Sequence, residues 1–172
     1  MIRNILLIII MFFSFVLQST LFKWINLGGV VPNLLIIVVA SIGFMKGKYY
    51  GLFYGLLAGI LYDIFYADIL GFYALLYMYI GYINGFFERL FFTREIKLPL
   101  ALIFISNLTY SLFVFLFLIL LQGNFEFLYY LTNIILPELI YTIILTIVLY
   151  PIILFVNYKF DEYERGRNKK FV

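Results

Sequence analysis

Long apolar runs, separated by short polar stretches, dominate the pattern of this chain. A helix that crosses a bilayer needs about 20 mostly apolar residues, because each residue adds about 1.5 Å of length. Two of the six qualifying runs are short. We expect an all-α integral membrane protein whose transmembrane domain, residues 1–158, is a six-helix bundle, followed by a basic cytoplasmic tail at 159–172. The spans lie at about 5–22, 30–45, 49–66, 69–90, 98–121 and 137–158.

The stretch between the last two runs, residues 122–136, is too apolar for an ordinary loop. Its sequence, QGNFEFLYYLTNIIL, is rich in tyrosine and phenylalanine, which are typical of the membrane–water interface. We expect a short interfacial helix that leads into the last span. The alternative is that the last span starts earlier and is long, tilted or kinked.

The basic residues orient the predicted bundle. With six spans and a cytoplasmic N-terminus, eleven of the twelve lysines and arginines lie on the cytoplasmic side, and Lys23 lies alone outside. Such a bias follows the positive-inside rule. We therefore predict a multi-pass protein of the cytoplasmic membrane with both termini in the cytoplasm.

The composition supports a membrane protein and excludes several kinds of chemistry. Hydrophobic residues make up 66% of the chain and charged residues only 12%, whereas about a quarter is charged in soluble domains. The chain has no cysteine and no histidine, so disulfides, thiol chemistry and most zinc or haem sites are excluded. We therefore expect no cofactor and no metal site. We also expect no nucleic-acid partner, because the basic residues sit in short loops and the tail.

A regular glycine stripe marks the third apolar run. Glycine recurs every four residues at Gly51, Gly55 and Gly59, and the next position in the series is Asp63. Small residues four apart let helix backbones approach closely in membranes. We predict that this stripe is a groove for the helix of a partner, with Asp63 as a polar anchor at its outer end. The alternative is that the stripe packs within the bundle, against the glycine pair Gly81 and Gly85.

Other polar residues gather at the predicted outer face. Gln18 closes the first span, Asn33 opens the second after Pro32, and Glu138 follows Pro137 at the start of the last. Each also has a plain structural interpretation, since asparagine caps helices and a carboxylate in a first turn favours the helix dipole. Asn107, nearer mid-membrane, is expected to bond a neighbouring helix inside the bundle.

In their order, these features resemble the family of the rod shape-determining protein MreD. The resemblance covers essentially the whole chain. Besides the residues already named, it rests on Gly71, eight residues after Asp63, on Leu34 after Asn33, and on the stretch ALLYMYIGYINGFF from Ala74. No single piece is specific, but the ordered set in a chain of this size is.

The resemblance implies a non-enzymatic scaffold of the bacterial cell-elongation machinery that helps to organise peptidoglycan synthesis and cell shape. Its direct partner would be the membrane segment of MreC, a single-pass protein. Through MreC it would meet RodA, a class B penicillin-binding protein and MreB, with membrane lipids around it. The family is also similar in fold to the substrate-binding subunits of energy-coupling-factor transporters, although fold does not carry function with it.

Two other functions remain open from the residues. Outer polar groups around Asp63, Asn33 and Glu138 would suit a substrate-binding subunit of a vitamin-type transporter. Asp63 and Glu138 would serve an intramembrane enzyme only if their helices touch, and no nucleophile is evident.

Overall fold

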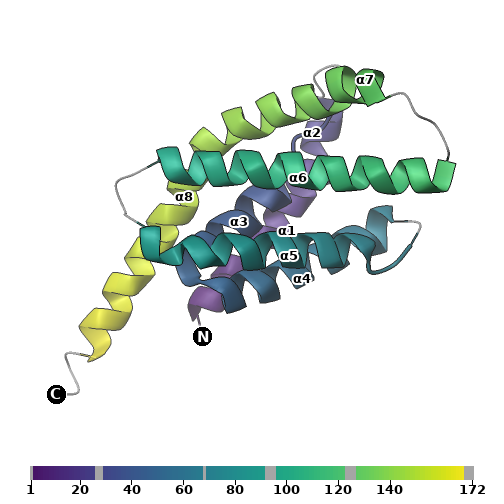
Figure 1. Cartoon of the computed structure of the whole chain (residues 1–172). Helices are drawn as coiled ribbons and strands as arrows, with labels where there is room; N and C mark the ends of the chain where they lie inside the picture. Colours follow the sequence, from purple (N-terminus) through teal and green to yellow (C-terminus); the bar gives the residue numbers. More distant parts are fainter. Residues whose placement is uncertain (1, 26–28, 68, 92–95, 123–126, 169–172) are drawn as a thin grey trace.

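The computed structural model describes residues 2–25, 29–67, 69–91, 96–122 and 127–168, and within them it is helical without strands. Figure 1 shows the long helices packed as a bundle, with α8 running obliquely across it and beyond. Six helices are long, and four elements of four or five residues connect or extend them. The long helices are α1 (Ile2–Ser19), α3 (Leu34–Lys46), α4 (Lys48–Tyr66), α5 (Phe72–Gly85), α6 (Lys97–Gln122) and α8 (Leu136–Asn168); the short ones are α2 (Leu21–Trp24), η1 (Phe86–Leu90), α7 (Phe127–Tyr130) and the π-helical η2 (Leu131–Ile135).

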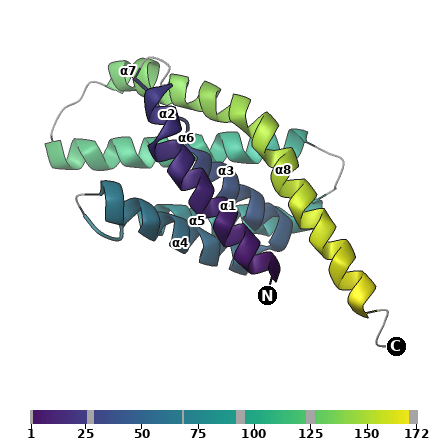
Figure 2. The ribbon, with the colours of Figure 1, turned by 180° about the vertical axis from the view of Figure 1, so that it is seen from behind.

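Helix α3 is the core of the bundle. All residues from Leu34 to Met45 are buried, because α3 contacts α1, α4, α5, α6 and α8 on its different sides. In Figure 2, α1 crosses in front of α3. In Figure 1, seen from the opposite side, α5 and α6 lie in front. The sequence of α3, LLIIVVASIGFM, is apolar around the whole helix, as expected for a helix without a solvent face.

A single residue, Gly47, joins α3 to α4. Its φ of 92° is a backbone conformation that side chains rarely adopt, and a Cβ there would also collide with the carboxylate of Glu88 in η1. The backbone conformation therefore requires glycine, whereas the flexible, exposed Glu88 side chain could move aside. This turn sends α4 back along α3 and places Lys48 beside the end of α5, where Gly85 touches its backbone. We call this the Lys48 end of the bundle, and the opposite one, where α4 finishes and α5 begins, the Asp63 end.

The glycine stripe of α4 packs against α5 of the same chain. A Cβ added at Gly51, Gly55 or Gly59 would come within 3.0 Å of α5 backbone atoms at Gly81, Tyr77 or Ala74 respectively. The close approach predicted from the stripe is therefore real, but the helix that uses it belongs to this chain.

The prediction of an open groove for a partner helix along Gly51, Gly55 and Gly59 is thus wrong. The four-residue spacing shows that a backbone approaches, but it cannot show to which chain that backbone belongs. The partner is α5, whose Gly81 and Gly85 face α4, as the alternative interpretation held. Gly43 of α3 joins the contact, because a Cβ there would also strike the Gly81 carbonyl.

The last helical segment begins earlier than Pro137. α7, η2 and α8 follow one another without a break from Phe127, so the separate interfacial helix is replaced by a continuous helix with a π turn. Proline lacks the N–H that an α-helix needs and clashes with the preceding turn, and a local π turn is one way for a membrane helix to accommodate such a break. The helix also continues past the predicted boundary at Tyr158, as far as Asn168.

Each of the six predicted apolar runs corresponds to a long helix, with bounds shifted by a few residues except at the last run. Two helical segments are long and apolar enough to cross a membrane by length and composition, Lys97–Phe117 and Phe127–Phe160. α1 and α3 are apolar but shorter. The six crossings and the cytoplasmic position of both termini stay predictions.

Candidate functional site

Asp63 is a cap for the helix that follows it. Its carboxylate accepts hydrogen bonds from the backbone N–H groups of Gly71, Tyr73 and Ala74, at 3.0, 3.1 and 2.9 Å. These donors open α5, and the first turn of a helix has no acceptors of its own. The N-cap residue Gly71 has a φ of 101° and no side chain to offer, so Asp63 supplies the acceptor from the preceding helix.

This environment corrects the predicted role of Asp63. The side chain is only 3% exposed, and both of its oxygens are used within the chain. A carboxylate is favourable there because the N-terminus of a helix carries a partial positive charge. Asp63 is therefore a structural residue of the α4–α5 pair and not an anchor waiting for a partner.

Gln18 and Asn33 together cap α3. The Asn33 Oδ1 accepts from the N–H of Ile36 at 3.2 Å, and the Gln18 Oε1 accepts from the N–H of Leu35 at 3.2 Å. The same Asn33 Oδ1 also accepts from the hydroxyl of Tyr77 at 2.9 Å. The capping interpretation of Asn33 is thus confirmed, and the buried start of the core helix has acceptors for two of its free N–H groups.

The predicted outer polar residues meet in a cavity at the Asp63 end, which we call the Glu138 cavity. It has a volume of about 410 Å³ and lies among α1, α4, α5, α6, α8 and the segment before α3. Gln18, Asn33 and Glu138 all line it, whereas Asp63 does not. Its lining residues are Phe15, Gln18, Ser19, Gly29, Val31, Asn33, Tyr62, Tyr66, Tyr73, Tyr110, Val114 and Glu138.

Glu138 is the one carboxylate among the described residues that line this cavity. It is partly buried and lies in the first turn of α8, directly after the π turn. The hydroxyl of Ser111 donates to its Oε2 over a long 3.4 Å. Because Asp63 is fully engaged elsewhere, the two carboxylates do not form the pair that an intramembrane enzyme would use.

Four tyrosines form a large part of the cavity wall. The ring of Tyr62 lies 5.1 Å from that of Tyr66 and 4.7 Å from that of Tyr73, and Tyr73 lies 6.1 Å from Tyr110. These rings come from α4, α5 and α6, so three helices close around one aromatic cluster. Sequence reasoning missed them, because tyrosine is frequent throughout this chain and no local pattern separates these four from the others.

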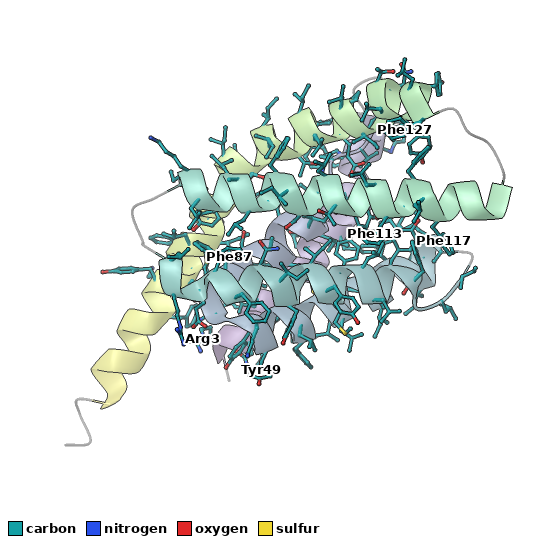
Figure 3. All side chains as sticks on the ribbon, viewed as in Figure 1. Arg3, Tyr49, Phe87, Phe113, Phe117 and Phe127 are labelled. Atoms are coloured by element: carbon teal, nitrogen blue, oxygen red, sulfur yellow. The ribbon has the colours of Figure 1, made fainter. Side chains whose placement is uncertain are left out.

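A second, apolar groove lies on the surface between α5 and α6. It has a volume of about 430 Å³ and is lined by Phe72, Leu75, Leu76, Tyr79, Ile80, Ile83, Thr109, Tyr110 and Phe113. Figure 3 shows the labelled Phe113 and Phe117 of α6 between that helix and α5. Phe117 stacks on Phe72 with 3.9 Å between ring centroids, which joins the two helices at this end of the groove.

Inside the bundle, a polar contact joins α5 to α6 at Asn84 instead of Asn107. The Asn84 Nδ2 donates to the Ser106 hydroxyl at 2.7 Å. Asn107 is fully buried, as expected for a packing residue, but neither of its side-chain polar atoms has a hydrogen-bond partner among the described residues. The expected interhelical bond from Asn107 is therefore not formed.

Nor do the described residues contain three carboxylates grouped so that they could hold a metal ion.

Taken together, the fold and these sites define a protein that is all-helical over the described residues, with helices suited to a membrane and with Gln18, Asn33 and Asp63 used to cap helices. The chain belongs to the family of the rod shape-determining protein MreD, whose family model matches residues 1–159. It is thus a membrane protein of the cell-shape machinery, from a shape-determining family and not a known enzyme family. No curated protein and no solved structure matches the chain.

Proposed function

We propose that this protein is a non-enzymatic membrane scaffold of the cell-elongation complex, and that it binds the membrane segment of MreC in the groove between α5 and α6. Through MreC it would help to organise RodA, its class B penicillin-binding partner and MreB for peptidoglycan synthesis. Family membership supports the role in rod shape. The partner, its binding surface and the absence of catalysis are our proposals.

The observation that carries the choice of surface is the division of α5 into two faces. One face, with Ala74, Tyr77 and Gly81, is buried against α4 and α3. The other, with Leu75, Tyr79 and Ile83, is more than half exposed and lines the groove. These three residues are four apart, so they form one ridge along the helix. An apolar helix packed there would interlock with this ridge.

The test is co-purification of tagged MreC with full-length variants from membranes. Ile83→Trp should fill the groove and reduce the recovered MreC several-fold, while the protein itself still inserts and accumulates. The matched control is Ile147→Trp on α8, because Ile147 is 55% exposed against 54% for Ile83 and lies outside the groove. Equal recovery of MreC with both variants would contradict the proposed surface.

The transporter alternative is favoured by one observation, the Glu138 cavity. A volume of about 410 Å³ falls within the range of small-molecule sites, roughly 300–1,000 Å³. Recovery of an energising ATPase with the purified protein, in place of cell-wall partners, would support that function.

A further inference from the structure

The Glu138 cavity has a polar arrangement that neither helix capping nor the scaffold role explains. We propose that it binds the ammonium group of an organic amine, with Glu138 as the counter-charge and the four lining tyrosines as the aromatic part of the wall. This inference goes beyond the scaffold function and does not depend on it.

The charge of the cavity favours a cation. Glu138 is the one ionisable carboxyl among the twelve lining residues, and none of the twelve is lysine or arginine. Among these described lining residues, an anionic group would therefore meet a carboxylate and no basic side chain. A charged group held away from water needs a partner of opposite sign, and an ammonium ion would be that partner.

The hydrogen bonds of the cavity single out Glu138 as its available acceptor. Gln18 and Asn33 already use their carbonyl oxygens on backbone donors of α3. Asp63, at the same end of the bundle, accepts three hydrogen bonds of ordinary length and lies outside the lining. Glu138 has the long contact with Ser111, so its carboxylate retains acceptor capacity toward the cavity.

The tyrosines supply the second part of an ammonium site. Ring faces attract cations through their negative quadrupole, and cages of several aromatic rings are a known way to bind ammonium groups. Tyr62 lies against both Tyr66 and Tyr73, with ring centroids 5.1 and 4.7 Å apart, and Tyr110 closes the cluster from α6. Because the rings come from three helices and the carboxylate from a fourth, the site exists only in the folded bundle.

Two kinds of molecule present such an ammonium group: a membrane lipid with an amine headgroup, such as phosphatidylethanolamine, and a soluble amine. The experiment uses the purified full-length protein in detergent. Ethanolamine is titrated while thermal unfolding is followed, with sodium chloride at equal ionic strength as the reference. In parallel, retention of phosphatidylethanolamine and of phosphatidylglycerol is compared by native mass spectrometry.

The variants separate the site from the rest of the molecule. Glu138→Gln should weaken binding of the ammonium compound at least about tenfold, because the counter-charge is lost. Tyr66→Leu should weaken it about two- to fivefold, and since Tyr66 is half exposed at the cavity rim, this variant is expected to fold. Glu88→Gln and Tyr158→Leu, which lie outside the lining, should bind as the unaltered protein does.

A saturable response to ethanolamine would identify a soluble ligand, and selective retention of phosphatidylethanolamine a lipid headgroup; either supports the proposal if Glu138→Gln removes it. The proposal is overturned if neither compound binds, if Glu138→Gln binds equally well, or if phosphatidylglycerol is retained as strongly. Recovery of MreC should be unchanged in Glu138→Gln, so this inference and the scaffold function can fail separately.

Discussion

At the level of single residues, the carboxylate of Asp63 serves as the cap of a helix that cannot cap itself. Gly71 is needed at the N-cap of α5 for its positive φ, and it therefore brings no side chain to the exposed N–H groups. In a low-dielectric surrounding, unsatisfied backbone donors are costly, so an acceptor from α4 substitutes for the missing cap.

We expect Asp63→Leu to destabilise the isolated protein. It leaves three backbone donors without an acceptor, and even one unsatisfied buried group costs roughly 1–3 kcal/mol. Asp63→Asn keeps one acceptor oxygen and should lose less. The measurement is the melting temperature of the purified protein in detergent without MreC. An unchanged melting temperature in Asp63→Leu, with loss of MreC recovery, would restore the anchor role that the structure contradicts.

The sequence identified Asp63 as unusual because a carboxylate in an apolar helix is costly without a partner. It did not identify the partner, because the three donors are backbone N–H groups. Every residue except proline carries such a group, so the residue types do not show which of them bond Asp63. The same limit applies to Gln18, whose role as a second cap for α3 depends on a contact between separate helices. Glu138 could be placed at the correct end, but its tyrosine neighbours could not.

At the level of elements, the pair α4 and α5 is held together by glycines on both helices. Gly51 and Gly81 face each other so closely that neither position has room for a Cβ. The sequence predicted the close approach, and the alternative interpretation named Gly81 and Gly85 as the residues opposite the stripe. It could not decide between an internal and an external partner, because both use the same small residues.

We expect Gly55→Leu to destabilise the isolated protein near or above the upper end of the roughly 1–3 kcal/mol typical of overpacking. The new side chain would collide with the backbone of Tyr77 and Met78, which cannot move as a flexible side chain can. Ile64→Trp adds bulk on the same helix at a position 63% exposed, and it should leave the melting temperature nearly unchanged. Equal stability of the two variants in detergent would argue against the internal packing of the stripe.

The long C-terminal helix shows a different limit of sequence reasoning. Pro137 is a usual mark of a helix start, and it led to a boundary ten residues too late. In the structure, the π turn of η2 lies directly before the first turn of α8, which contains the proline. α7, η2 and α8 are therefore parts of one continuous helix. The apolar, aromatic character of residues 127–136 was the signal for this, and it left the early start open as an alternative.

At the level of the whole molecule, the distribution of basic residues predicts that the Asp63 end faces outward and the Lys48 end faces the cytoplasm. The chain has no cysteine, so single cysteines report position without interference. A membrane-impermeant thiol reagent applied to intact spheroplasts should label Leu70→Cys, in the turn before α5 and 75% exposed, but not Leu90→Cys, at the end of η1. Labelling of Leu90→Cys without labelling of Leu70→Cys would show that the orientation is opposite to the predicted one.

The central claim has two parts: the glycine stripe holds α4 to α5, and we propose that the opposite, exposed face of α5 binds MreC. The most direct measurement is photo-crosslinking in living cells, with a photoreactive amino acid at position 83, at position 147 or at position 64. We predict a covalent adduct with MreC from position 83 and none from the other two, which are similarly exposed. An adduct from position 64, on α4, without one from position 83 would contradict the account.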